Sequence, residues 1–171
     1  MKVNKDRRTT RWIAVVALSL AVVPNAGRAD DASVRKELAA NYDKITMALD
    51  HKDSTSLRTI VTQDFTMEEA GKKMDGKASL AVIEKGFKTT GSVGEDAMKI
   101  RTLKVNGNTA IATVAYKRTS TSVPDKKHKT HAIASNGITE DTWVKTKSGW
   151  RLKSVKTLKS EMTVDGKPMK T

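Results

Sequence analysis

Apolar residues recur every three or four positions between residues 30 and 52, a spacing that predicts an amphipathic helix with one buried face. That face carries Val34, Leu38, Tyr42, Ile45 and Leu49. Asp53 can then cap a second, short helix that ends at Val61. The two segments together predict a helical hairpin.

The pattern then changes to the alternation of a strand. Residues Phe65–Glu68 alternate in this way, and Lys72–Asp75 can return as a second short strand after a turn. A third helix is predicted to begin at Gly76 and to end at the glycines Gly91 and Gly94.

The rest of the chain is rich in strands. Asn106-Gly107-Asn108 predicts a tight hairpin between Ile100–Val105 and Thr109–Ser120. A further segment, His128–Lys147, is too long for one ordinary strand, and Asn136-Gly137 lies in its middle. We expect a bulge or sharp bend there; a second tight hairpin is the alternative.

The last strand is predicted over Trp150–Lys159, with Trp150, Leu152 and Leu158 on its core side. Helices at the start and strands at the end favour an α+β fold, with three helices in the N-terminal half on one face of an antiparallel sheet. We expect a single domain over residues 30–160 and a polar C-terminal tail over residues 161–171.

The N-terminus has the composition of an export signal. A basic start is followed by the apolar run Trp12–Val23, then by Pro24, and small residues precede Asp30. This arrangement is typical of a secretory signal peptide over Met1–Ala29, and the apolar run is too short to cross a membrane as a helix. We therefore expect a periplasmic or secreted protein without a stable membrane span. The alternatives are a short amphiphilic or buried helix, or an uncleaved anchor.

The amino-acid composition excludes several kinds of functional site. The 171 residues contain no cysteine, which excludes disulfides, thiolate zinc sites and thiol nucleophiles. The formal net charge is +13, but removing the six basic residues and one acidic residue of the signal leaves 26 basic against 18 acidic residues. Few aromatic residues lie among these lysines, so no nucleic-acid partner is expected. A solvated lysine surface explains the remaining charge.

Three segments stand out within this order of elements: residues Thr62–Thr66, Met74–Leu80, and Asp141–Lys145 continuing through Ser148–Leu152. Together with that order, they resemble the nuclear transport factor 2-like superfamily, in particular its SnoaL-like and ketosteroid-isomerase-like members. The resemblance implies a curved sheet that wraps the helices into a cone, often with a pocket in its mouth, and frequent homodimers packed through the sheet.

Asp141 and Trp143 are two residues apart, so on a strand they share one face. A carboxylate beside an indole in a cavity is a plausible general base. The simpler interpretation, which we favour from sequence, is an exposed charge paired with a neighbouring lysine. Tyr42 could likewise present its hydroxyl to a ligand, or act only as a core aromatic residue.

No recognisable catalytic set is present, and no cofactor is expected. His128 and His131 are three apart on a predicted strand, so they face opposite ways and predict no metal site. Glu69 is expected at the rim of the pocket. The residues predicted to line the pocket are Tyr42, Phe65, Met67, Phe87, Trp143 and Asp141.

Three functions remain open from the sequence. The first is an exported protein that binds a small apolar molecule in the cone. The second is a pocket enzyme of the isomerase or dehydratase type that uses Asp141 and Tyr42. The third is a non-catalytic interaction module that forms a homodimer through its sheet.

Overall fold

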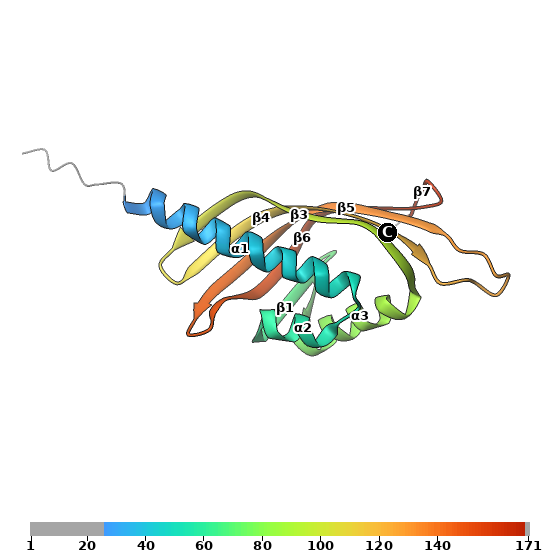
Figure 1. The fold of residues 1–171 in the computed structure, drawn as a ribbon, viewed down its shortest axis with the longest axis horizontal. Helices are drawn as coiled ribbons and strands as arrows, with labels where there is room; N and C mark the ends of the chain where they lie inside the picture. Colours follow the sequence, from blue (N-terminus) through green and yellow to red (C-terminus); the bar gives the residue numbers. More distant parts are fainter. Residues whose placement is uncertain (1–25, 170–171) are drawn as a thin grey trace, which may run out of the picture.

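The computed structural model describes residues 26–169, and their side chains from residue 31 onward. Figure 1 shows three helices on one side of a long, curved sheet. The elements are α1 (Ala26–Asp50), α2 (Ser54–Ile60), β1 (Val61–Glu69), β2 (Lys72–Asp75), α3 (Gly76–Thr89), β3 (Thr90–Asn106), β4 (Thr109–Ser122), β5 (Ala132–Thr146), β6 (Gly149–Val164) and β7 (Lys167–Pro168).

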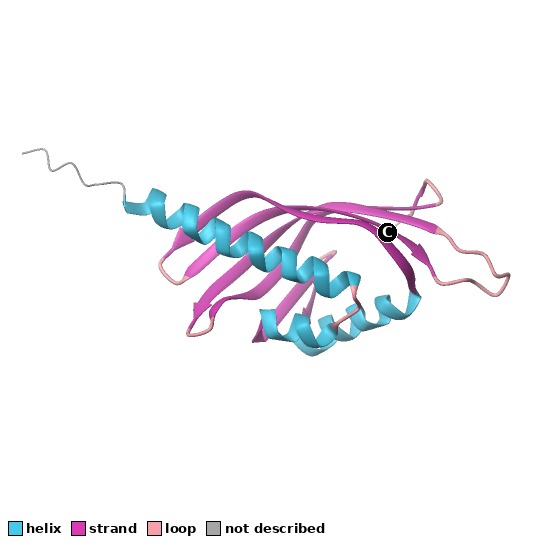
Figure 2. Ribbon diagram, viewed as in Figure 1, coloured by secondary structure: helices cyan, strands magenta, loops and turns pink. Residues whose placement is uncertain are grey.

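The predicted α+β class is confirmed. Strands β2-β1-β6-β5-β4-β3 form the sheet in this order, and β7 pairs with β6. One junction differs from the purely antiparallel sheet that we expected: β1 runs parallel to β6. The chain reaches β6 only after α3 and three long strands, so this pairing joins the two ends of the fold (Figure 2).

Side-chain caps set the starts of the two shorter helices. Asp53 accepts a hydrogen bond from the backbone N–H of Ser56 at 3.0 Å, as predicted. Asp75 accepts one from Ala78 at 2.8 Å at the start of α3. These bonds satisfy amide groups that have no partner within the helix.

The predicted end of the third helix is wrong. Helix α3 ends at Thr89, and both Gly91 and Gly94 lie within β3. They occur where the register with β4 shifts, and a Cβ on either one would lie 2.7 Å from an oxygen of Ser122 or Thr119. These glycines therefore allow close strand contact instead of ending a helix.

A hairpin at Asn136-Gly137 is also ruled out, because β5 continues through both residues. Gly137 pairs with Tyr116 on β4, and a Cβ there would lie 2.6 Å from the Tyr116 hydroxyl. The register shift with β6 falls just after it, between Ile138 and Thr139, and leaves Leu158 of β6 without a paired residue. A bulge near this point was predicted, but the extra residue lies on the partner strand.

A second register shift explains a further error in the sequence analysis. Leu158 is 52% exposed, although its parity with Trp150 and Leu152 predicted a core position. Between Thr142 and Trp143 the register with β6 also shifts and leaves Lys153 unpaired, which reverses the alternation of faces between Leu152 and Leu158. Residues 161–164, predicted to belong to a polar tail, continue β6.

The strand predicted from His128 begins only at Ala132. His128 lies in the preceding loop with φ of 58°, so the opposite-face argument for the two histidines does not apply.

Within residues 26–169, no helix is long and apolar enough to cross a membrane. Most of the predicted signal peptide lies outside the described residues, and its last four residues, 26–29, begin α1.

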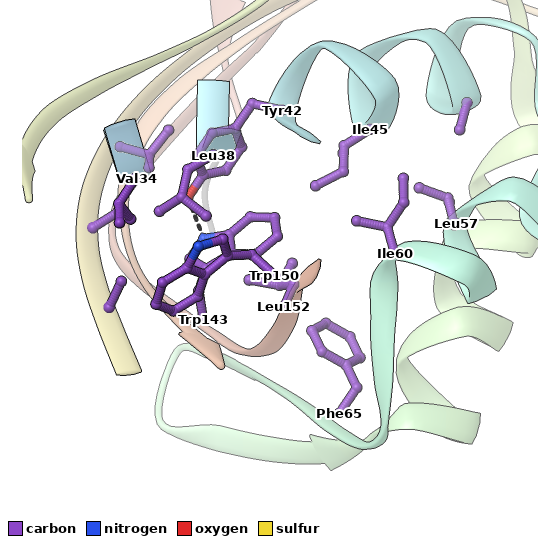
Figure 3. Packing of buried hydrophobic residues seen from close by; sticks show 14 of the residues in the cluster. Val34, Leu38, Tyr42, Ile45, Leu57, Ile60, Phe65, Trp143, Trp150 and Leu152 are labelled. Atoms are coloured by element: carbon purple, nitrogen blue, oxygen red, sulfur yellow. Dashed lines mark hydrogen bonds between the residues drawn. The ribbon is translucent and has the colours of Figure 1, made fainter. Parts of the chain in front are cut away.

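The core forms between the predicted apolar face of α1 and the inner face of the sheet. Val34, Leu38, Tyr42 and Ile45 are all buried on that helix face. Figure 3 shows them above the side chains of β5 and β6, with those of α2 and β1 on the other side. The fold thus places a tyrosine of α1 directly against the strand that carries Asp141.

Candidate functional site

A buried polar cluster joins α1 to β5. The Tyr42 hydroxyl donates a hydrogen bond to Asp141 Oδ2 at 2.8 Å and accepts one from Trp143 Nε1 at 2.9 Å. Tyr42 is 2% exposed, Trp143 0% and Asp141 3%. Figure 3 shows the bond between the tyrosine and the indole inside the apolar core.

Small residues on β4 make room for this cluster. Ala112 pairs with Asp141, and Ala110 pairs with Trp143; neither alanine is exposed. Without larger side chains on the neighbouring strand, the indole and the helix can both approach the sheet. The tyrosine and tryptophan rings meet edge to face, with centroids 5.2 Å apart and an interplanar angle of 82°.

The hydrogen bonds run in one direction. An indole N–H can only donate, so the Tyr42 oxygen accepts a hydrogen bond from Trp143, and the Tyr42 hydroxyl donates its own hydrogen bond to Asp141. The other carboxylate oxygen, Asp141 Oδ1, is buried and receives no hydrogen bond from the described residues. The chain of bonds therefore ends at an acceptor that no described residue bonds with normal geometry, although the hydroxyl of Thr139 lies nearby.

Burial raises the pKa of Asp141 to about 6, and the nearby hydroxyls of Thr139 and Tyr42 limit the increase. Burial beside this carboxylate also raises the pKa of Tyr42, which stays protonated. The exposed, lysine-paired Asp141 that we favoured from sequence is wrong. A carboxyl group enclosed by aromatic side chains is chemically suited to hold or transfer a proton near neutral pH.

No family model matches the sequence, and no curated protein matches it. Solved structures do match its fold. A nuclear transport factor 2-like protein from Salmonella enterica serovar Typhimurium aligns with a TM-score of 0.59 and 18% identity, over 74% of this chain and 90% of that one. The chain has the nuclear transport factor 2-like fold.

Two enzymes or candidate enzymes share this nuclear transport factor 2-like fold. A putative dehydratase from Streptomyces avermitilis gives a TM-score of 0.62 at 15% identity, over 74% of this chain and 96% of that one. A hexachlorocyclohexane dehydrochlorinase gives 0.61 at 11% identity, over 83% and 93%. At these identities the comparison concerns the fold, which is used by binding proteins and pocket enzymes alike.

The other predicted pocket residues lie apart from the cluster. Phe65 is buried and lines a hollow of about 410 Å³ between α2, β1 and α3, which the three cluster residues do not line. Met67 and Phe87 are half-buried against the core, and Glu69 is exposed. The nuclear transport factor 2-like fold thus brings together Tyr42, Asp141 and Trp143, three of the six predicted residues.

The sequence analysis missed a second buried carboxyl group. The Asp96 side chain is 3% exposed, lies 3.6 Å from Arg118, and has Oδ2 without a hydrogen bond. Burial raises its pKa to about 6, although Arg118 opposes the increase. The sequence could have indicated this position, because Asp96, Met98 and Ile100 alternate along one strand and therefore share the face that packs against the helices.

The histidines form no metal site with their neighbours in the described part of the chain, where no cluster of three or more His, Cys, Asp or Glu could hold an ion. His131 instead lies between two carboxylates, with Nδ1 2.7 Å from Asp165 and Nε2 3.6 Å from Asp125. Its hydrogen bond to Asp165 raises the pKa of His131. This cluster ties the β4–β5 loop to the end of β6.

Asp141 is expected to make the protein less stable as the pH rises from about 4 to about 6. Its pKa is 3.8 in the unfolded chain and about 6 in the folded one, so the folded protein holds the proton more tightly in this window. The stabilisation is complete below the unfolded pKa and is lost as the pH passes the folded pKa. Urea denaturation from pH 4 to 7 should show the loss for the wild type and a smaller loss for Asp141→Asn. Asp96, whose pKa is raised as well, contributes to the loss that remains. Parallel curves for both proteins would contradict this role of Asp141.

Proposed function

We propose that this protein binds a small, mainly apolar molecule on the inner side of its sheet, outside the cytoplasm after removal of residues Met1–Ala29. Asp141 would supply the main polar contact and Tyr42 would hold that carboxylate in place. The observation that carries the proposal is the enclosed Asp141 carboxylate, whose Oδ1 receives no hydrogen bond of normal geometry from the described residues. Buried acceptors are normally paired, and the polar group of a ligand would supply the partner.

A ligand would have to reach Asp141 along the inner face of the sheet, because Asp141 itself is only 3% exposed. On the same face of β5, towards the start of the strand, Thr139 and Gly137 lie next to Asp141 and are buried. Farther along that face, Tyr116, Arg118 and Ser135 are only half-buried, in contrast to the closed half under α1. A ligand lying on this open half would extend its polar end past Thr139 towards Asp141.

Native mass spectrometry of protein isolated from the cell envelope tests the proposal. We expect a bound compound of constant mass that is released on denaturation, and a chain that begins at Asp30. Asp141→Asn keeps the shape and an acceptor for the Tyr42 hydroxyl, so it should fold but retain much less of the compound. Glu140→Gln is the control, because Glu140 is exposed on the opposite face. A wild-type protein without any bound compound would contradict the proposal.

A second candidate function rests on the raised pKa of Asp141. A carboxyl group that titrates near 6, held by a tyrosine hydroxyl, has the properties of a general acid or base of an isomerase or dehydratase. If the compound is converted by the wild type and only bound by Asp141→Asn, the enzyme is favoured over the binding protein. The same spectra would show a doubled mass if the homodimer proposed from the family resemblance forms.

A further inference from the structure

We propose that a latch, closed at acidic pH, holds the end of α1 against the sheet and opens as the pH rises. It is built from Asp50 of α1, Asp96 of β3 and Arg118 of β4. Figure 1 shows that the sheet continues beyond the end of α1, so the latch lies between the closed half of the inner face and its open half. A ligand that moves towards Asp141 crosses this border, and only that consequence rests on the proposed function.

Arg118 connects the two sides of the latch. Its Nη2 donates a hydrogen bond to the backbone carbonyl of Leu49 at 3.4 Å, and its Nη1 lies 3.6 Å from Asp96 Oδ2. Both distances are longer than the roughly 2.7–2.9 Å of a strong charge-assisted bond. Ala48 is the last fully buried residue of α1, and Leu49 is half-buried. The last turn of α1 therefore depends on polar contacts of moderate strength.

The second contact of the latch joins two carboxyl groups. The Asp50 side chain lies within hydrogen-bonding reach of Asp96. Two carboxylates can only accept, so a bond between them requires a proton on one of them. The Asp96 side chain is 3% exposed, and its burial raises its pKa to about 6; the charge and hydrogen bond of Asp50 add to the increase, whereas Arg118 opposes it. Asp96 therefore holds the proton that closes the latch.

Two further cations near the latch have other partners. Lys52, in the turn after α1, donates from its ammonium group to two backbone carbonyls at the start of β3. Lys117 of β4 forms an ion pair with Glu95 of β3 at 2.7 Å. Neither cation forms an ion pair with Asp96.

The remaining charges beside Asp96 are opposite in sign. Asp43 of α1 and Lys99 of β3 line a groove of about 370 Å³ between these two elements, which Asp96 also lines. Loss of the proton thus leaves two adjacent carboxylates, Asp96 and Asp50, with the guanidinium of Arg118 as their one ion-pair partner in the described part of the chain. Their repulsion is relieved when the last turn of α1 moves away and water reaches Asp96.

The direction of the pH effect follows from the pKa of Asp96. It is about 6 while the latch is closed, and it returns towards 3.8 when water reaches the carboxyl group. Opening therefore releases a proton. The closed form is fully favoured below the lower value and loses this advantage as the pH rises through the higher one, so the open fraction should rise about tenfold between pH 5 and pH 7.

Amide hydrogen exchange of the full-length protein, followed by NMR between pH 5 and pH 7, tests the latch without any ligand. The reporters are the backbone amides of His51, Lys52 and Asp53, which donate to carbonyls in the last turns of α1. Their protection factors, which are corrected for the intrinsic effect of pH, should fall about tenfold. The amide of Tyr42, in the middle of α1, should stay more strongly protected. Equal protection along the helix would mean that the last turn does not open by itself, and would overturn the proposal.

Two variants separate Asp96 from the other buried carboxyl group. Asp96→Asn keeps the shape of the side chain and has no proton to lose in this range, so its protection factors should stay constant. Asp141→Asn is the matched control, because it removes the other raised pKa away from the latch and should keep the tenfold fall. An equal fall in Asp96→Asn and the wild type, or no fall in the wild type, would also overturn the latch. If native mass spectrometry finds no bound compound, the proposed function fails, and these protection factors still decide whether the latch exists.

Discussion

Replacing Tyr42 with phenylalanine is expected to lower the free energy of unfolding by about 3 kcal/mol at neutral pH. The ring and its packing remain, but two buried groups lose their partner at once. The Trp143 indole N–H loses its acceptor, and Asp141 Oδ2 loses its donor. Leaving one buried polar group unpaired costs about 1–3 kcal/mol, and more when the group is charged. The midpoint of urea denaturation should fall with an unchanged slope.

Tyr116→Phe is the matched control. Its hydroxyl also bonds to a side chain, donating to Ser160 at 3.1 Å, but in an exposed position where water can replace the lost partner. We expect a loss of under about 1 kcal/mol. At pH 4 the loss in Tyr42→Phe should become smaller, because a neutral Asp141 accepts a weaker hydrogen bond. Equal losses for the two tyrosines would show that the buried chain of bonds contributes no special stability.

Gly137→Ala is expected to destabilise the protein by about 3 kcal/mol. A Cβ at this position would overlap with the backbone carbonyl oxygen of Lys159 and would lie 2.6 Å from the hydroxyl of Tyr116. The tyrosine ring could turn aside, but the neighbouring strand cannot move without breaking the pairing of β5 with β6. The cost therefore comes from the backbone, and the same denaturation measurement will show it.

The matched control for Gly137 is Gly86→Ala, and it should have the opposite sign. Gly86 lies in α3, and a Cβ there would meet nothing within 4 Å. Alanine is the better helix former, so we expect a gain of about 0.5–1 kcal/mol. If both variants lost stability equally, the close approach at Gly137 would not be the reason that this position requires glycine.

The buried cluster has a cost that bears on function. A carboxylate in an apolar interior is unfavourable, and an apolar residue of similar size would often be at least as stable. Here Asp141 remains in the core, with one oxygen bonded to Tyr42 and the other without a hydrogen bond of normal geometry from the described residues. A group kept at this cost and titrating near 6 is a candidate for binding or proton transfer, which the Asp141→Asn experiments measure directly.

Local patterns were sufficient to predict most of the fold. The buried face of α1, the cap at Asp53, the start of α3 at Gly76 and the turn at Gly107 all agree with the structure. Each depends on interactions within a few residues: the helical period, a side chain bonding to the next turn, or a turn that suits glycine. The order of these elements was enough to indicate an α+β fold.

The alternation of side chains along a strand was enough to relate two of the three residues of the buried cluster. It placed Asp141 and Trp143 on one face, and the structure confirms this because β5 pairs with β4 without a register shift there, while the shift against β6 puts the extra residue, Lys153, on β6. The same argument failed at Leu158 because bulges on β6 reverse the faces, and a bulge depends on the partner strand. The sequence also gave no reason for β1 to pair in parallel with β6, since the two strands are far apart in the chain.

The sequence by itself thus determined the helices, most strands and the face that each side chain takes where a strand is regular. Only the tertiary structure decided that Tyr42, nearly a hundred positions before Asp141, bonds to it and encloses it. It also decided that Asp96 and Arg118 meet the last turn of α1 at one place. Burial, pKa and the pairing of polar atoms depend on which distant segments pack together, and local periodicity carries no information about that choice.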